Sequence, residues 1–275
     1  EPGRLIVTAT DTTSVVAQAG FSFTVSVEDA FGNRIVLGDH KNITVSATVS
    51  GTTAAITAGR QVRANDDGIA TFSDLVVTGS VSDTISVSFT VAYTRLSDNQ
   101  VVTVSSSVSA ITLTHGAAAS IAMTNSATAQ SGIAFTSQPV VRILDAYGNL
   151  VSTGAQSTQT VRLSASGSTL SGPAAISASG GIATFSSIAL EGLIGSKTLT
   201  AEVSAPATFS AATSVSLSFG NVSQLTLERA AAGAANRIAF TTQPQIALRD
   251  SAGNIVTGTT ATISFSVSPS ATISA

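Results

Sequence analysis

The chain of 275 residues contains no cysteine and no tryptophan, and only 10% of its residues are charged. The lack of cysteine excludes disulfide bonds, thiolate metal sites and cysteine nucleophiles. The lack of tryptophan, with only two tyrosines, leaves few aromatic rings on which a sugar could stack. Lysine and methionine are also scarce, which makes the chain a poor target for proteases and oxidants. We therefore expect an extracellular, cell-surface location.

Strong charge and long apolar runs are missing too. The net charge is −3, and the 12 basic residues are scattered, so no basic patch indicates a nucleic-acid partner. Mean hydropathy is +0.40, yet no run approaches the roughly 18 apolar residues of a membrane-spanning helix. The opening EPGRLIVTAT lacks the charged and apolar regions of a secretion signal, so we expect a mature or excerpted chain.

What the sequence does contain is alternation of apolar residues with Ser and Thr. It is clear in FSFTVSV (residues 21–27), ISVSFTVAY (85–93) and SVSLSF (214–219). A period of two residues, with many β-branched side chains, is typical of half-buried strands. No segment shows a sustained helical period, and Ala-rich RAAAGAAN (229–236) is interrupted by glycine. The sequence predicts an all-β fold.

Two motifs recur along the chain. D-x-x-G-N begins at Asp29, Asp145 and Asp250, at intervals of 116 and 105 residues. G-I-A-T-F-S occupies residues 68–73 and 181–186, at 39 and 36 residues after the preceding motif. Recurrence at such intervals indicates homologous units, each long enough for an immunoglobulin-like sandwich of about seven strands.

A third repeated segment defines the units further. IAFTSQP (133–139) and IAFTTQP (238–244) also lie 105 residues apart. We predict tandem Ig-like β-sandwich domains, two complete and a third partial, covering residues 1–116, 117–222 and 223–275. The strands predicted for the first unit are 4–10, 21–28, 42–49, 60–64, 69–77, 84–94 and 101–114.

The third unit is about half present, because its second motif would fall after residue 275. Open sheet edges and unburied apolar faces suit an isolated domain poorly. Either the sequence is an excerpt of a longer repeat protein, or a neighbouring chain completes the unit by adding strands. We favour the excerpt, since one added strand would not replace three.

The D-x-x-G-N motif raises the choice between a ligand site and a turn. Asp accepts hydrogen bonds from following backbone N–H groups, Gly supplies a positive φ and Asn tolerates it, so the motif predicts a turn between strands. The predicted turn residues are Asp29, Gly32, Asn33, Asp145, Gly148, Asn149, Asp250, Gly253 and Asn254. The alternative is a Ca²⁺ site at the domain junctions, although no D-x-D-x-D loop is present.

These motifs resemble the bacterial Ig-like repeats of invasin and intimin. That family pairs D-x-x-G-N-x-V with a G-x-A-T strand 35 to 40 residues later. The matches to the second motif are Gly68, Ala70 and Thr71, and Gly181, Ala183 and Thr184. The resemblance covers essentially the whole chain and implies sandwiches that form stalks of adhesins, S-layers and other large surface proteins. It implies no receptor-binding tip in this segment.

Residues for catalysis are hard to find. The two histidines, His40 and His115, are 75 residues apart, so no histidine pair has metal-ligand spacing. No nucleophile elbow, phosphate-binding glycine loop or pair of glycosidase carboxylates is evident. We therefore expect neither catalysis nor a cofactor.

Two N-x-[ST] sequons, at Asn42 and Asn221, are candidate glycosylation sites. Asn221 lies at the predicted boundary between the second and third units, where a glycan would stiffen the hinge.

The leading hypothesis is a non-catalytic, extracellular structural segment of a surface assembly: an adhesin stalk, an S-layer or a surface filament. Its expected partners are copies of itself or neighbouring repeats. The alternative is a ligand- or carbohydrate-binding adhesin module.

Overall fold

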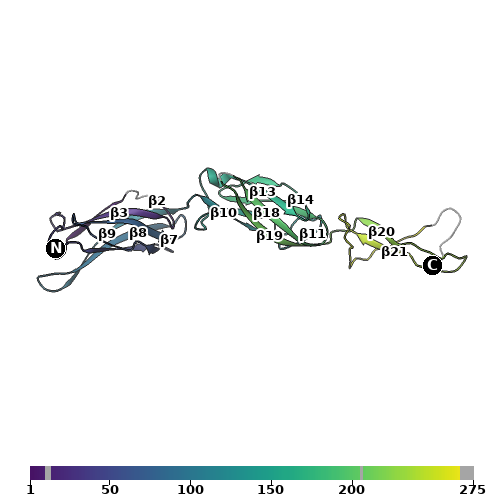
Figure 1. Cartoon of the computed structure of the whole chain (residues 1–275), viewed down its shortest axis with the longest axis horizontal. Coiled ribbons are helices and arrows are strands. Elements are labelled where there is room, and N and C mark those ends of the chain that lie inside the picture. Colours follow the sequence, from purple (N-terminus) through teal and green to yellow (C-terminus); the bar gives the residue numbers. More distant parts are fainter. Residues whose placement is uncertain (10–13, 205–206, 267–275) are drawn as a thin grey trace.

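The computed structural model describes residues 1–9, 14–204 and 207–266. Three β-rich units follow one another along the longest axis, with the N-terminus at one end and the last described residues near the other (Figure 1). We call the predicted ranges 1–116, 117–222 and 223–275 the first, second and third units. The helix in the described residues is a 3₁₀ turn, η1 (Ala155–Thr158). No helix in this part of the chain is long and apolar enough to span a membrane.

The first unit is a sandwich of two sheets. One sheet has the order β1-β3-β7-β5, with β1 (Arg4–Ala9), β3 (Gly20–Glu28), β7 (Ile69–Thr78) and β5 (Ala55–Ala58). The other has the order β2-β9-β8-β4-β6, with β2 (Ser14–Val16), β9 (Val101–Thr114), β8 (Thr84–Thr94), β4 (Thr44–Ser50) and β6 (Gln61–Arg63). The orders β1-β3-β7-β5 and β9-β8-β4 correspond to the ABED and GFC sheets of the immunoglobulin fold.

Three phenylalanines occupy the centre of this sandwich. Phe23 and Phe72 come from one sheet and Phe89 from the other, and all three are buried. The ring centroid of Phe89 lies 5.1 Å from that of Phe23 and 5.1 Å from that of Phe72. Rings at this separation and in tilted geometry pack favourably. Alternate residues of each strand therefore converge on one core between the sheets.

The second unit repeats this plan. One sheet has the order β10-β12-β16, with β10 (Ala118–Thr124), β12 (Val140–Asp145) and β16 (Ile182–Thr184). The other has the order β11-β19-β18-β13-β15, with β11 (Thr128–Gln130), β19 (Phe209–Ser218), β18 (Gly195–Val203), β13 (Thr160–Ser166) and β15 (Ala175–Ser177). In addition, β14 (Thr169–Ser171) and β17 (Ala189–Glu191) pair with each other as a two-stranded antiparallel sheet. The core of the second unit includes buried Phe185 and shares no residue with the core of the first unit.

The all-β sandwich prediction is confirmed, and the seven strands predicted in the first unit are present with ends shifted by up to two residues. The sequence missed β2 and β5. These strands are three and four residues long, too short for alternation to be distinguished from a loop. β2 pairs in parallel with β9 and so helps to close one edge of the sheet.

The third unit consists of β20 (Gln224–Arg229) and β21 (Gln245–Arg249) among its described residues. No further strand follows β21 among the described residues up to 266, and residues 267–275 lie outside the described part. Leu225 pairs with Leu248 as Ile121 pairs with Ile143 in the second unit. Leu225 is 57% exposed, whereas Ile121 is 8% exposed. The apolar face that an opposing sheet covers in the second unit is therefore open here.

Candidate functional site at the unit junctions

The D-x-x-G-N loops have one geometry in all three units. In each, one carboxylate oxygen (Oδ1) of the Asp accepts hydrogen bonds from the backbone N–H groups two and four residues later, at 2.9 to 3.0 Å. The other oxygen (Oδ2) accepts from the Asn side-chain amide at 2.8 to 3.0 Å. The motif glycines have φ of 93°, 86° and 86°. The residues thus hold a tight connection after β3, β12 and β21.

Two of the three carboxylates make one further contact. Asp145 Oδ2 accepts the backbone N–H of Gly116 at 2.7 Å, and Asp250 Oδ2 accepts that of Gly220 at 2.8 Å. Gly116 lies between β9 and β10 and Gly220 between β19 and β20, in the linkers that lead to the next unit, 29 and 30 residues before the Asp that each contacts. The loop at the start of a unit therefore also fixes the linker that enters it.

The electrostatics of these carboxylates follow from the same hydrogen bonds. Burial raises the pKa of Asp145 and of Asp250, but the N–H donors, led by the linker glycine, together lower each pKa by more, and the net result is below the ordinary 3.8. The pKa of Asp29 is also lowered, chiefly by the Asn33 side-chain amide. All three groups are ionised at neutral pH and act as acceptors.

At the first junction, between the first and second units, His115 joins the linker to the next unit. Thr153 donates its backbone N–H to His115 Nε2 at 3.2 Å, and its hydroxyl lies 2.9 Å from the same nitrogen. Since a backbone N–H can only donate, Nε2 is an acceptor and Nδ1 carries the proton. Nδ1 accordingly donates to the Gly116 carbonyl at 2.8 Å. A longer contact of 3.5 Å runs from Gln18 Nε2 to the Tyr147 carbonyl.

At the second junction, between the second and third units, the motif asparagine reaches across. Asn254 Nδ2 donates to the Gly192 carbonyl at 2.9 Å, and Asn254 Oδ1 accepts the Ile194 N–H at 2.9 Å. Asn254 is buried. Ser251 adds a hydrogen bond to Glu191. The turn in the third unit is thus seated on the loop that follows β17 of the second.

The linker glycine of the second junction is sterically required. A Cβ on Gly220 would lie 2.0 Å from the Ser131 carbonyl oxygen, far inside any tolerable contact. A Cβ on Gly116 would meet nothing closer than 3.4 Å. The two linkers therefore share one hydrogen bond but differ in how closely they pass the preceding unit.

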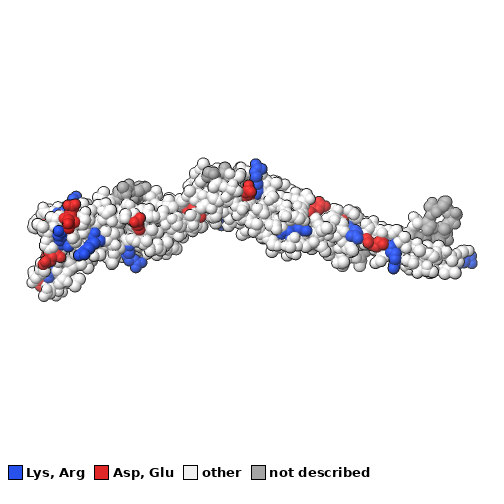
Figure 2. Space-filling view, in the orientation of Figure 1, with Lys and Arg blue, Asp and Glu red and all other residues white. Residues whose placement is uncertain are grey.

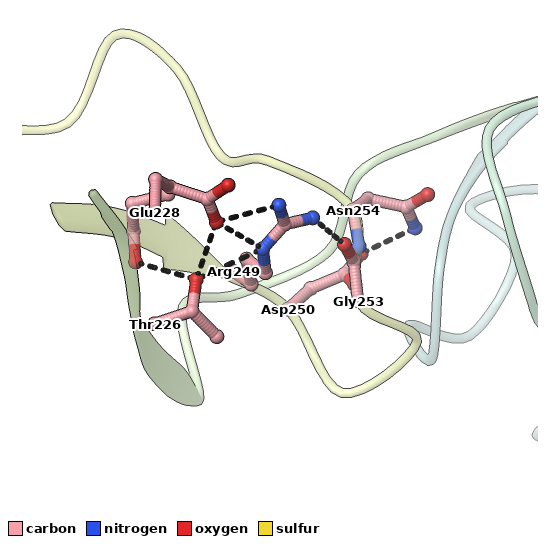
Figure 3. Close-up of polar contacts among 7 residues, drawn as sticks. Thr226, Glu228, Arg249, Asp250, Gly253 and Asn254 are labelled. Atoms are coloured by element: carbon pink, nitrogen blue, oxygen red, sulfur yellow. Dashed lines mark hydrogen bonds and ion pairs between the residues drawn. The ribbon is translucent and has the colours of Figure 1, made fainter. Parts of the chain in front are cut away.

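In the third unit an ion pair supports the seated loop (Figure 3). Arg249 Nη2 lies 2.7 Å from Glu228 Oε1, and Arg249 Nη1 donates to the Gly253 carbonyl. Glu228 has a lowered pKa because Arg249 donates hydrogen bonds to it. Arg249 therefore ties β20 and β21 to the D-x-x-G-N turn.

A cation would find few free ligands in these loops. Both oxygens of Asp145 and of Asp250 already accept two hydrogen bonds each. Among residues 1–9, 14–204 and 207–266, no group of three or more His, Asp and Glu is placed to hold a metal ion. The geometry fits a turn and a linker clamp better than a calcium site.

The two candidate glycosylation sites, Asn42 and Asn221, differ in their surroundings. Asn42 is half-buried, has φ of 60° and donates to Asp66 Oδ1 at 3.2 Å, so its side chain is already engaged. Asn221 is exposed and directly follows Gly220. A cavity of about 290 Å³ in the second unit is lined by Thr128, Phe135 and other residues that carry no ionisable side chain.

The comparisons with known proteins give no family assignment. No family model matches the chain, and no curated protein matches it. Among solved structures, β-glucuronidase from Parabacteroides merdae is 10% identical over 78% of this chain and 24% of its own, with a TM-score of 0.28. A protocadherin gammaB7 EC3-6 fragment is 12% identical over 82% and 52%, with a TM-score of 0.35.

A C-terminal intimin fragment, solved in complex with the intimin-binding domain of its translocated receptor, is 14% identical over 83% of this chain and 67% of its own. Its TM-score is 0.24. The chain spans only about a quarter of the β-glucuronidase. At such scores these similarities carry no argument about this chain, and its fold is established by its own sheet order.

Sequence reasoning identified the loop residues but missed their second role. It considered His115 only as a metal ligand and did not single out Gly116 or Gly220, and the structure brings all three to the junctions. The signal that could have found the glycines is their spacing, 29 and 30 residues before a motif Asp. No comparable signal exists for Asn254. Its counterpart Asn149 has the same place in the motif and makes the same hydrogen bond to the Asp of its own turn.

Proposed function

We propose that this chain is a non-catalytic structural segment of an extracellular surface assembly, such as an adhesin stalk, an S-layer or a filament, built from sandwiches joined end to end. The observation that carries the proposal is the glycine-to-aspartate hydrogen bond at both junctions, 2.7 Å and 2.8 Å long. A loop that orders the linker as well as its own unit suits a chain whose task is to hold successive domains in a fixed arrangement.

The mechanism is mechanical. Each complete sandwich buries its own core, so stability is local to a unit and its neighbours. The junction contacts then restrict bending between units, and the repeats project or tile a surface. Few charged side chains and no cysteine suit exposure to an oxidising environment rich in proteases.

Distances between spin labels test this proposal directly. Because the chain has no cysteine, Ser107→Cys with Ser164→Cys provides two unique labelling sites, on exposed positions of the first and second units. We expect one narrow distance distribution, matching the structure. A broad distribution that extends to short distances would mean freely jointed units and would contradict a structural role.

The alternative, a carbohydrate-binding module, needs an accessible aromatic platform. Tyr93 packs edge-on against His40 with ring centroids 4.7 Å apart, and its hydroxyl donates to the Pro2 carbonyl. Tyr147 lies in the first-junction loop and is 46% exposed, so it is the tyrosine that such a module would have to use. A glycan array probed with the whole chain separates the two functions, since saturable binding to one glycan class would favour the module.

A further inference from the structure

The N-terminal end of the first unit exposes large apolar side chains. Phe31, in the first D-x-x-G-N loop, is 91% exposed, and Leu37 and Leu96 are 80% and 64% exposed. Three contacts hold this end together: Gly3 N–H to the Glu28 carbonyl at 2.7 Å, Tyr93 hydroxyl to the Pro2 carbonyl at 2.8 Å, and Leu96 N–H to Glu1 Oε1 at 3.0 Å. We call the loop at residues 29–33, residues 1–3 and the turn at 95–100 the end surface.

Charged residues also gather at this end of the molecule (Figure 2). Several of them are paired: Arg4 with Glu28 at 2.7 Å, Lys41 with Asp66 at 3.1 Å, and Arg95 with Asp98 at 3.0 Å. Such pairs neutralise one another and favour no partner of one sign. The unusual feature of the end surface is therefore its exposed Phe31.

The corresponding loops of the other two units are covered. Asp145 and Asp250 are each 1% exposed, whereas Asp29 is only half-buried. Asn33 is exposed, while Asn254 is buried against the preceding unit. The end surface thus has the architecture of a junction without the preceding sandwich.

The hydrogen-bond pattern supports the same conclusion. Asp145 Oδ2 and Asp250 Oδ2 each accept one N–H from their own asparagine and one from a linker glycine. Asp29 Oδ2 accepts only from Asn33 Nδ2 among the described residues. A carboxylate oxygen commonly accepts two hydrogen bonds, so Asp29 Oδ2 can take one more donor in the same direction.

A partner of matching chemistry is present within the chain. The second unit's loop after β17, which seats the third unit, exposes Leu193 and Ile194 at 64% and 58%. At the second junction the position equivalent to Phe31 holds Ala252, and Leu193 and Ile194 remain exposed. A phenylalanine there would bury apolar surface on both sides of the contact.

We propose that the end surface is a docking surface for the C-terminal end of another sandwich of this repeat type. A linker glycine of that sandwich donates its N–H to Asp29 Oδ2, and its loop, with apolar side chains in the places of Leu193 and Ile194, packs on Phe31. The proposal deepens the structural function proposed above and rests on it.

The lack of tryptophan in the chain makes Phe31→Trp a unique fluorescent probe at an exposed position. The test compares this variant with two extended chains, in which a copy of residues 117–220 or of residues 1–116 is placed directly before Glu1. Both copies end in a linker glycine, 29 residues before Asp29, the spacing found between Gly116 and Asp145. We expect emission at shorter wavelength and a loss of acrylamide quenching in the chain extended by residues 117–220, because that copy contains Leu193 and Ile194.

Two controls make the result specific. In the extended chain that responds, replacing the added linker glycine by proline removes the N–H donor and should restore the exposed spectrum. In the chain of 275 residues, Tyr147→Trp is a reference for the same loop at a formed junction, where the side chain is 46% exposed against 91% for Phe31, so its quenching should be intermediate.

The outcomes separate this proposal from the function it rests on. If the Phe31→Trp probe stays as accessible to acrylamide in both extended chains as in the unextended chain, the docking proposal is overturned; the structural function then stands if the label distances between positions 107 and 164 are narrow. If the Phe31→Trp probe stays accessible and those label distances are broad, both proposals are overturned. Protection of the Phe31→Trp probe in the unextended chain that increases with protein concentration would identify a second copy as the occupant and would overturn the tandem docking.

Discussion

The first and second junctions use the same loop but fix it by different contacts. Both place a linker glycine N–H on a motif aspartate. Beyond that, the first junction depends on His115 and its contacts with Thr153, whereas the second buries Asn254 against the loop after β17. The shared contact sets the position of the linker, and the unit-specific contacts set how firmly the next sandwich is held. We therefore expect the second junction to be stiffer.

The largest difference is expected for alanine at the linker glycines. Gly220→Ala places a Cβ 2.0 Å from the Ser131 carbonyl oxygen, while Gly116→Ala finds its nearest atoms at 3.4 Å. Forcing an atom into such a contact typically costs about 1–3 kcal/mol, so Gly220→Ala should release the third unit. Spin labels at Ser164→Cys and Thr257→Cys measure the effect of Gly220→Ala, and labels at positions 107 and 164 measure that of Gly116→Ala. Equal broadening of both junctions by the two alanine variants would contradict the steric difference.

A smaller effect is expected for the motif asparagines. Asn254→Ala removes the hydrogen bonds to the Gly192 carbonyl and the Ile194 N–H, which are only partly buried, and a typical hydrogen bond contributes about 0.5–1.5 kcal/mol. Asn149→Ala loses only the bond to Asp145 among these contacts. Amide hydrogen exchange measures both variants, and we expect faster exchange at Ile194 in Asn254→Ala alone. If the Ile194 amide keeps its protection, Asn254 does not clamp the junction.

Acid should weaken both junctions together. The pKa values of Asp145 and Asp250 are lower in the folded chain than the ordinary 3.8. Their contribution to stability is thus fully present above pH 3.8 and is lost as the pH falls through the lower folded values. The two label pairs, measured from about pH 6 downward, should broaden below about pH 4. Asp145→Asn should remove this pH dependence at the first junction only.

The sequence carries most of the information for the fold and only part for the junctions. Alternation reveals long strands such as β8 because every second side chain faces one core. Three glycine-containing repeats reveal the turns because a positive φ restricts the residue type. These are local constraints, and a single chain records them directly.

The junction contacts depend instead on how two folded units meet. Nothing around Asn254 distinguishes it from Asn149, yet only Asn254 bonds to the loop after β17. His115 lies in a small-residue linker, and its partner Thr153 is 38 residues away. Such contacts follow from the direction in which the linker leaves one sandwich, which no short-range pattern specifies.

The smallest expected effect is at His115. His115→Ala removes the acceptor for the Thr153 N–H and the donor to the Gly116 carbonyl, and a typical hydrogen bond contributes about 0.5–1.5 kcal/mol. The distance distribution between labels at positions 107 and 164 should widen modestly, while that between 164 and 257 stays unchanged. Thr153→Ala is the matched control, since it keeps the backbone N–H and loses only the hydroxyl, and it should widen the distribution less. Widening by Thr153→Ala equal to that by His115→Ala would show that the hydroxyl, and not the backbone contact, holds the first junction.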